Sequence, residues 1–158
     1  MGFKVVGVDI NDDVLDMVKS QGADAVFNSR SNKNYIEEVK AFMNRGPNKG
    51  ADAVAVFSAA DAVYRSAPPL VKLGGIIMVV RLPAKGVTFD ALDIARGTYR
   101  VKGDSTGIPP RIKKAIDFTA KHNIRPEVEI HKSLEHVNGM VERMKKGELT
   151  KRQVVQFV

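Results

Sequence analysis

The residue types that most often carry catalysis are scarce in this chain of 158 residues. It contains no cysteine, which excludes disulfides, thiolate ligands for zinc and a cysteine nucleophile. Its three histidines, His122, His131 and His136, lack the H-x-x-x-H or related spacing of metal ligands. His122 lies near the end of a predicted helix, where the helix dipole favours a basic side chain. The sequence therefore predicts neither a catalytic residue nor a metal site.

Phosphate binding by a glycine-rich loop is not predicted either. The loop at 46–50 lacks the G-x-x-x-x-G-K-[ST] spacing that lets backbone N–H groups cradle phosphates. The remaining candidate is Asp9, a carboxylate that directly follows the apolar run 5–8, with Asn11 close behind it. Such an acid at the end of a buried strand either accepts hydrogen bonds from a ligand or lies on the approach to the next helix without binding anything. Asn11 suits a helix N-cap better than a ligand contact.

Apolar runs that alternate with amphipathic stretches must position these residues. Short runs such as 76–80 are typical of parallel strands buried on both faces, and the stretches 110–121 and 134–146 carry apolar residues on one helical face. The alternation predicts an α/β fold with a doubly wound, mainly parallel, Rossmann-like sheet. We expect strands at 5–8, 25–27, 53–57, 76–80, 98–103, 128–130 and 153–158, and helices at 11–22, 34–43, 110–121 and 134–146. An alanine-rich helix is also expected after residue 57, bent or interrupted by Pro68 and Pro69.

Particular residues are predicted to begin and end the first helices. Asn11 would cap the first helix and Gly22 would end it. Asn34 and Glu37 have the spacing of a capping pair at the start of the second helix. Residues 82–97 show neither the helical nor the strand periodicity of apolar residues and are expected to form a loop.

The net charge of +7 is unevenly distributed. Residues 1–60 contain 7 Lys and Arg against 8 Asp and Glu, whereas residues 61–158 contain 18 against 10. The basic residues follow helical spacings, and no aromatic-basic alternation indicates a base-stacking surface, so nucleic acid is not an expected partner. No apolar run reaches the roughly 18 to 20 residues that span a bilayer, and the first residues lack a signal-peptide pattern. We expect a soluble, cytoplasmic protein without a membrane partner.

Five segments follow the opening Met1–Asp9 in a recognisable order: Gln21-Gly22-Ala23-Asp24, Gly74-Gly75 before the run 76–80, Leu82-Pro83-Ala84, Val101-Lys102-Gly103, and 115–124. In this order and spacing they resemble the nucleotide-binding domain of the zinc-type, medium-chain alcohol dehydrogenases. Met1–Asp9 is similar to that family's second strand, which ends in an acid. The likeness includes the cinnamyl-alcohol-like, aldehyde-reducing branch and runs nearly the full length of the chain.

The resemblance implies an NAD-binding Rossmann domain, of which residues 1–158 are expected to form only a part. The family's first strand and G-x-G-x-x-G turn would precede Met1, so we expect weak NAD binding at most. The family's zinc ligands belong to a catalytic domain that these residues do not include, and no zinc ligands are expected here. Without the first strand, which is central in the order 3-2-1-4-5-6, two strand edges would face a gap.

The resemblance also places cofactor contacts at strand ends. Asp9 would bind the adenosine ribose, and its charge would favour NAD over NADP. Arg81 replaces a glycine beside the nicotinamide ribose and would obstruct the cofactor, face solvent or pair with a phosphate. Arg152 stands near the family's pyrophosphate-binding Arg, or belongs to a solvated basic end. The candidate cofactor-binding residues are Asp9, Asn11, Phe57, Ser58, Val80, Arg81, Leu82 and Arg152.

The resemblance and the residues missing from it leave two possible functions of different classes. The first is an alcohol-dehydrogenase-like, NAD-dependent oxidoreductase that interconverts alcohols and aldehydes, with no activity from this chain alone. The alternative is a non-catalytic binding module that acts through self-association or a protein partner. Self-association would use the edge around Val87-Thr88-Phe89, by which the family dimerises, or the vacant strand position.

Overall fold

The computed structural model describes residues 2–43, 48–83, 85–103, 108–149 and 151–157. They belong to two compact units, Met1–Gly107 and Ile108–Val158. Segment 44–47, Ala84 in the Leu-Pro-Ala match and part of the loop 46–50 lie outside the described residues. Each unit contains its own parallel β-structure.

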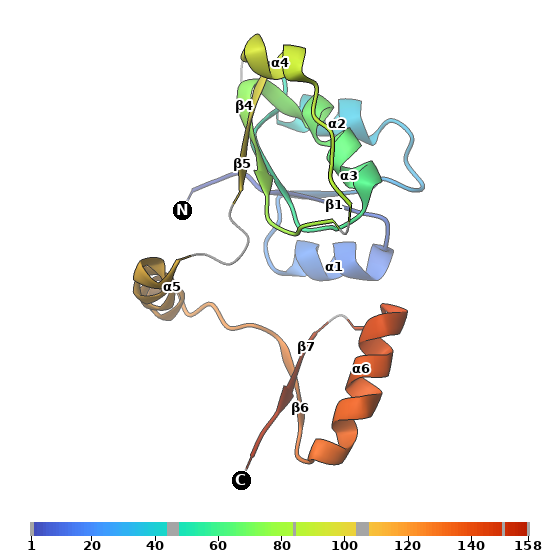
Figure 1. Cartoon of the computed structure of the whole chain (residues 1–158), viewed down its shortest axis with the longest axis vertical. Coiled ribbons are helices and arrows are strands. Elements are labelled where there is room, and N and C mark those ends of the chain that lie inside the picture. The colour runs from blue at the N-terminus through green and yellow to red at the C-terminus, as the bar shows by residue number, and fades with distance from the viewer. Residues whose placement is uncertain (1, 44–47, 84, 104–107, 150, 158) are drawn as a thin grey trace. The chain divides into compact units, whose positions relative to one another are not determined.

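Strands and helices alternate along both units, and every strand pair is parallel (Figure 1). This arrangement confirms the predicted α/β class. The strands form three sheets in the described residues: β1 (Val6–Asp9) with β2 (Ala25–Asn28); β3 (Ala51–Val56), β4 (Val71–Val79) and β5 (Tyr99–Gly103) in that order; and β6 (Val128–His131) with β7 (Arg152–Val155). The helices are α1 (Asp12–Ser20), α2 (Tyr35–Phe42), α3 (Asp61–Ser66), α4 (Ala91–Ala95), α5 (Pro109–Lys121) and α6 (Val137–Lys146), with 3-10 turns η1 (Pro68–Leu70) and η2 (Leu134–His136).

Helix α1 packs against the β1–β2 sheet and begins as the sequence predicts. The Asn11 side chain accepts a hydrogen bond from the Asp13 N–H at 2.9 Å, which confirms the N-cap. Gly7 lets the helix approach the strand, because a Cβ at this position would lie 2.7 Å from Cγ1 of Val18. The end of β1 and the start of α1 are thereby fixed by local contacts.

The main core lies around the β3–β4–β5 sheet. Ile77 in the central strand is fully buried, and Phe89 has its ring 6.4 Å from that of Tyr64 and 6.2 Å from that of Tyr99. The cluster comprises Val56, Tyr64, Ala67, Val71, Ile77 and Tyr99. Val87 and Phe89, which the resemblance placed at a dimer edge, pack against the core of their own sheet. Self-association through that segment stays a prediction.

The structure corrects several predicted elements. Strand β4 begins at Val71 rather than at residue 76, and the ladder with β3 has an irregularity between Ala51 and Ala53 that absorbs the extra length. The expected loop 82–97 contains the short helix α4. Asn34 makes no side-chain capping hydrogen bond, so the predicted capping pair is wrong. The Asn34 N–H instead donates to Oδ1 of Asn32 at 2.9 Å, which places Asn34 in a turn of its own.

The second unit consists of α5, β6, η2, α6 and β7. The predicted helix 134–146 is divided, because its first residues form η2, and the last strand ends at Val155 rather than at the C-terminus. Gly147 ends α6 in the left-handed conformation, with φ of 72°. None of the described residues from 108 onwards is fully buried, in contrast to the first unit. No helix in the described part of the chain is both long and apolar enough to cross a membrane.

Candidate functional site

Among the predicted site residues, Asp9 at the carboxyl end of β1 has its carboxylate fixed by backbone hydrogen bonds. Oδ1 of Asp9 accepts hydrogen bonds from the backbone N–H groups of Ile10, at 2.7 Å, and Asn11, at 3.0 Å. These bonds hold the carboxylate at the point where the chain leaves the sheet. No described residue hydrogen-bonds Oδ2, so this oxygen is available to a ligand. Asn11 uses its own side chain to cap α1, as predicted.

A shallow cavity of about 490 Å³ adjoins this strand end, lined by Ile10, Asn11, Asp12, Asp13 and Arg30. Asn28, the last residue of β2, ties the two turns together. Its Nδ2 donates to Oδ1 of Asp12 at 2.7 Å, and its Oδ1 accepts from the N–H of Arg30 at 2.8 Å. Arg30 was not predicted from the sequence. In the sequence Arg30 is only a basic residue just after the second strand. The pairing of β1 with β2 is needed to show that it lies near the end of β1.

The second group of predicted residues gathers at the carboxyl ends of β3 and β4. The Val56 carbonyl accepts hydrogen bonds from the N–H groups of Val80, at 3.2 Å, and Arg81, at 3.1 Å. The Tyr64 hydroxyl donates to the Arg81 carbonyl, which fixes the backbone of Arg81 while its side chain stays exposed. These contacts gather five of the predicted residues at the carboxyl end of the sheet: Phe57, Ser58, Val80, Arg81 and Leu82.

Most side chains of this second group lack a fixed role in the structure. Phe57 and Leu82 are 69% and 66% exposed, and Ser58 accepts a local hydrogen bond from the N–H of Ala60 at 3.1 Å. The alternatives for Arg81, obstruction of a cofactor, pairing with a phosphate or exposure to solvent, all fit an exposed guanidinium. The cofactor roles of Phe57, Ser58 and Arg81 therefore stay predictions.

Arg152 belongs to the second unit, so its distance from the other candidates is not defined. It is exposed and begins β7, where its backbone N–H donates to the Glu127 carbonyl at 3.3 Å. Its predicted contact with a pyrophosphate stays a prediction.

One histidine of the second unit, His131, takes part in a polar network around Glu129. Arg143 binds both carboxylate oxygens of Glu129, at 2.8 and 3.3 Å, and Gln153 donates to Glu129 at 2.7 Å. The hydrogen bonds from Arg143 and Gln153 lower the pKa of Glu129 from 4.5 to about 2. His131 hydrogen-bonds Gln153 at 2.7 Å, and its ring lies 5.4 Å from that of His136. No group of three or more His, Cys, Asp or Glu among the described residues could hold a metal, so these residues do not fit the zinc that the resemblance implies.

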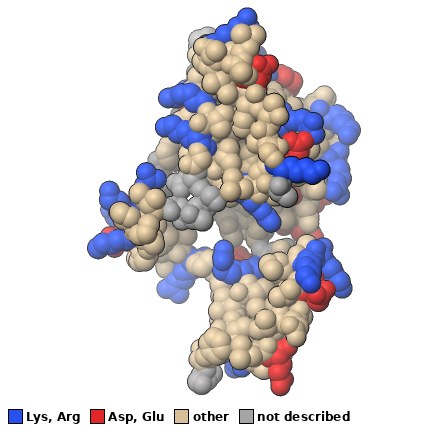
Figure 2. Space-filling view, in the orientation of Figure 1, with Lys and Arg blue, Asp and Glu red and all other residues tan. Residues whose placement is uncertain are grey.

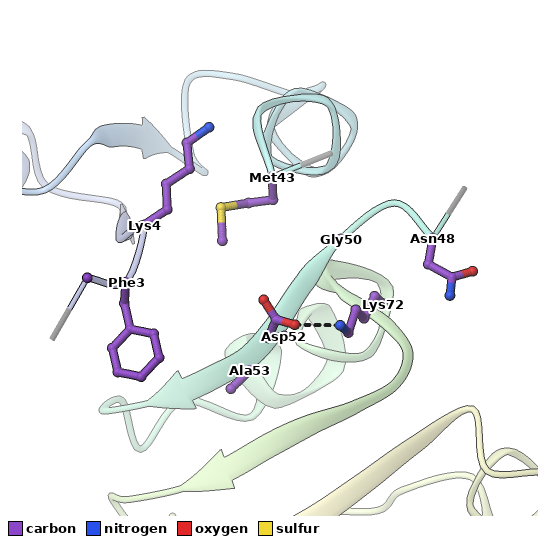
Figure 3. Close-up of a pocket in the computed structure, with 9 residues that line it drawn as sticks. Phe3, Lys4, Met43, Asn48, Gly50, Asp52, Ala53 and Lys72 are labelled. Atoms are coloured by element: carbon purple, nitrogen blue, oxygen red, sulfur yellow. Dashed lines mark ion pairs between the residues drawn. The ribbon is translucent and has the colours of Figure 1, made fainter. Parts of the chain in front are cut away.

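A second cavity, also of about 490 Å³ but more enclosed, lies at the opposite ends of the strands (Figure 3). Residues just before β1, such as Phe3 and Lys4, line one side of it, and Gly50 and Ala53 at the start of β3 line another. This cavity contains none of the predicted cofactor residues. Because ligands of open α/β sheets bind at the carboxyl ends of strands, the shallow cavity beside Asp9 is the better cofactor candidate.

Basic side chains do not mark a further binding surface on the face shown in Figure 2. There, Lys and Arg lie on several elements and are separated by uncharged surface and by acidic residues. The expectation that nucleic acid is not a partner stays a prediction.

Comparison with known proteins gives a consistent result. The model of a family described as zinc-binding dehydrogenase matches residues 1–121. Two alcohol dehydrogenases of Geobacillus stearothermophilus are 35% and 28% identical over 99% of this chain. The chain spans only 44% of the length of each.

Solved structures share the fold at lower identity. An alcohol dehydrogenase from Aeropyrum pernix covers 95% of the chain, with a TM-score of 0.79 and 23% identity, and the chain covers 42% of it. An acetophenone reductase from Geotrichum candidum, solved in complex with NAD, covers 98% with a TM-score of 0.78 and 23% identity, and 42% of it is covered. A cinnamyl alcohol dehydrogenase from Sorghum bicolor gives a TM-score of 0.80 at 22% identity, over 98% of this chain and 41% of that one. The parallel α/β structure and the match over residues 1–121 together show that this chain belongs to the zinc-binding dehydrogenase family and is related to alcohol dehydrogenases.

Proposed function

We propose that this chain supplies nucleotide-binding residues of an NAD-dependent, alcohol-dehydrogenase-like oxidoreductase, and that Asp9 accepts hydrogen bonds from the adenosine ribose. The observation that carries the proposal is the Asp9 carboxylate at the carboxyl end of a parallel strand, with Oδ1 held by two backbone N–H groups. Oδ2 then offers a fixed acceptor for a vicinal diol. Membership of the family and its relation to alcohol dehydrogenases support the same assignment.

The negative charge of Asp9 favours NAD over NADP in this proposal. A carboxylate within hydrogen-bond reach of the ribose 2′ position attracts a hydroxyl and repels a phosphate. Arg30 lines the same cavity and moderates this repulsion without removing it. NAD, when bound, would accept or supply the hydride, and the residues of this chain would only bind and orient it.

The second part of the proposal is that these residues alone do not turn over an alcohol. The described residues hold no ligand set for the zinc that would polarise the alcohol oxygen. The test mixes the purified chain with NAD, zinc and a series of simple alcohols and follows the absorbance of the reduced cofactor. We expect no cofactor reduction above background, and turnover at ordinary enzyme rates would contradict this part.

Calorimetry separates the oxidoreductase proposal from a non-catalytic binding module. Measurable, saturable NAD binding that weakens in an Asp9 variant supports a cofactor site. Absence of NAD binding at millimolar concentration supports the module. The edges of β1 and β3 that have no partner strand among the described residues favour the module independently.

A further inference from the structure

Tyr64 joins the core of the first unit to the backbone that follows β4. It lies in α3, and only 2% of its surface is exposed. Its hydroxyl donates a hydrogen bond to the carbonyl of Arg81, two residues beyond the end of β4. A buried hydroxyl that lost this acceptor would be left unpaired, which is costly, so the bond favours one arrangement of both residues. A buried side chain therefore holds the backbone at a strand end where candidate cofactor residues gather.

The packing of the Tyr64 ring fixes the position of its hydroxyl. The ring of Phe89 lies edge-to-face with it at 6.4 Å between centroids. Val56 and Ile77 belong to the same buried cluster as Tyr64. Because side chains in a close-packed core are held in few rotamers, the hydroxyl has little freedom to leave the Arg81 carbonyl.

Both backbone polar groups of Arg81 are hydrogen-bonded within the first unit. Its N–H donates to the Val56 carbonyl at 3.1 Å, beside the N–H of Val80 at 3.2 Å, and its carbonyl accepts from Tyr64. Its guanidinium is exposed and makes no ion pair or hydrogen bond with another described residue. The contacts that hold Arg81 therefore do not depend on its side chain.

The bond from Tyr64 also sets the direction of the next backbone donor. The carbonyl of Arg81 and the N–H of Leu82 belong to one planar peptide unit, and no peptide bond in the described residues is cis. In a trans peptide these two groups point in opposite directions, so the Leu82 N–H is directed away from Tyr64. No described residue accepts a hydrogen bond from it. The Leu82 N–H is thus an oriented donor just beyond the carboxyl end of β4, where ligands of open parallel sheets bind.

We propose that Tyr64 is a positioning residue for the nicotinamide half of NAD, because its hydroxyl holds the Arg81 carbonyl and so turns the Leu82 N–H toward the cofactor. The inference rests on the proposed function, in which NAD binds at the carboxyl ends of the strands with its adenosine ribose at Asp9. The resemblance independently places the nicotinamide ribose beside Arg81. Tyr64 is buried, so it acts through this peptide unit and not by contact with NAD.

The hydroxyl raises NAD affinity by removing freedom from the unliganded protein. Residues 80–83 form neither helix nor strand. Without the hydroxyl, the Val56 carbonyl would still hold the N–H groups of Val80 and Arg81, but the peptide unit between Arg81 and Leu82 would lose its contact with the core. NAD would then have to order this unit on binding, at a cost in affinity. AMP, which has the adenosine ribose but no nicotinamide, would not meet that cost.

The test compares NAD and AMP as ligands of the wild-type chain and of Tyr64→Phe, by NMR titration of the isotope-labelled protein. Tyr64→Phe keeps the packed ring and removes only the hydroxyl. We expect its NAD affinity to fall by roughly three- to tenfold, as for the loss of one neutral hydrogen bond, while its AMP affinity stays the same. In the wild type, NAD should shift the Leu82 amide resonance strongly, and AMP should shift it little.

Tyr99→Phe is the matched control. Tyr99 is also 2% exposed, belongs to the same cluster and has its ring 6.2 Å from that of Phe89. No described residue hydrogen-bonds its hydroxyl, so the substitution removes a core hydroxyl without freeing the Arg81 carbonyl. This variant should match the wild type with both ligands. Equal losses of NAD affinity in Tyr64→Phe and Tyr99→Phe would attribute the effect to the core in general and overturn the proposal.

Arg81→Gly tests whether Tyr64 acts through the carbonyl or through the guanidinium. Glycine keeps the carbonyl and gives the backbone more freedom. Tyr64→Phe should therefore weaken NAD binding in the Arg81→Gly background at least as much as in the wild type. A double-mutant cycle in which Arg81→Gly abolishes the effect of Tyr64→Phe would show that the side chain of Arg81 carries it, contrary to the proposal.

Failure of this inference and failure of the proposed function give different results. If Asp9→Asn weakens both NAD and AMP while Tyr64→Phe changes neither, the adenosine site stands and the role of Tyr64 is refuted. If Tyr64→Phe weakens both ligands equally, Tyr64 serves only the core. If the wild type binds neither ligand at millimolar concentration, the proposed function and this inference both fail. Should Tyr64→Phe not fold, the wild type decides, because a Leu82 resonance that NAD leaves unchanged contradicts the proposal.

Discussion

At the scale of single residues, Asp9 has one carboxylate oxygen held by two backbone N–H groups and a second that no described residue hydrogen-bonds. Asp9→Asn keeps the shape of the side chain and an acceptor for the N–H groups of Ile10 and Asn11, but it removes the charge. Hydrogen bonds to charged groups contribute about 1.5–3 kcal/mol, so we expect NAD binding to weaken by roughly ten- to a hundredfold. NADP binding should weaken less, because the repulsion of a 2′-phosphate is lost. Titration calorimetry with both cofactors measures the two changes.

Asp13→Asn is the matched control for Asp9→Asn. Asp13 lines the same cavity, so the substitution removes the same charge from the same surroundings. The substitution should change NAD affinity only slightly. Asp13 lies in the first turn of α1 and not at the carboxyl end of a strand, where the ribose is expected to bind. If both variants weaken NAD equally, general electrostatics explains the effect and the assignment of Asp9 to the ribose is wrong.

The Glu129 carboxylate predicts an acid-sensitive contribution to stability in the second unit. Its folded-state pKa of about 2 lies below the ordinary value of 4.5, chiefly because Arg143 and then Gln153 hydrogen-bond the charged form. A lowered folded pKa stabilises the fold above pH 4.5, and this contribution is lost as pH falls toward 2. Glu129→Gln should therefore lower stability at neutral pH and flatten the change between pH 4.5 and 2, as followed by denaturant unfolding.

The magnitude of this effect is limited by solvent, because the Glu129 and Arg143 side chains are 37% and 42% exposed. Glu142→Gln is a suitable control, since Glu142 makes only a surface ion pair with Lys145. This substitution should leave the dependence of stability on pH between 4.5 and 2 close to that of the wild type. Identical profiles for the wild type and Glu129→Gln would refute the role given to the Glu129 network.

At the scale of elements, the cap of α1 is open to a direct test. Asn11→Ala removes the acceptor for the Asp13 N–H and should lower the free energy of unfolding by about 1 kcal/mol. Asn11→Ser restores a capping oxygen and should recover most of the loss. Thermal or denaturant unfolding measures both. If Asn11→Ser restores stability but not NAD binding, Asn11 contacts the cofactor as well, contrary to our preference for capping alone.

The elements that could be predicted from the sequence are those with a strong local signal. Each of the seven predicted strands overlaps a strand of the structure, because apolar runs bounded by polar residues signal buried parallel strands directly. The start of β4 was misplaced, because Gly74-Gly75 suggested a turn whereas the strand continues through it. The five-residue helix α4 is too short for a helical period to be visible. Asn34 has capping chemistry, but its backbone is taken up by a neighbouring turn.

Some residues of the candidate site could likewise be predicted from the sequence, and others could not. Asp9 was singled out as an acid at the end of an apolar run, and Arg81 through the resemblance, in which it replaces a glycine. The structure places both at or just after the carboxyl end of a parallel strand, and their cofactor roles stay predictions. Arg30 and the cavity beside it were not predicted, since they depend on which two strands are neighbours. The resemblance implied two strand edges without a partner, and among the described residues β1 pairs only with β2 and β3 only with β4.

At the scale of the whole molecule, the two units differ in how much they bury. All the fully buried residues in the described part of the chain lie between Leu15 and Tyr99, in the first unit. The second unit has a two-stranded sheet in which Ile130 is 54% exposed. Isolated two-stranded structure is marginally stable in water, so the units should not share one stability.

Hydrogen exchange at residue resolution tests this difference. The amide of Ile77, in the centre of the three-stranded sheet and fully buried, should exchange only when the first unit unfolds. The amide of Val154 in β7, paired only with β6, should exchange at least tenfold faster and lose its protection at lower denaturant concentration. The Glu129→Gln variant should accelerate exchange at Val154 and leave Ile77 unchanged, because the network that it breaks lies within the second unit. Equal protection at the two amides, lost together in one transition, would show that the units fold as a single cooperative structure.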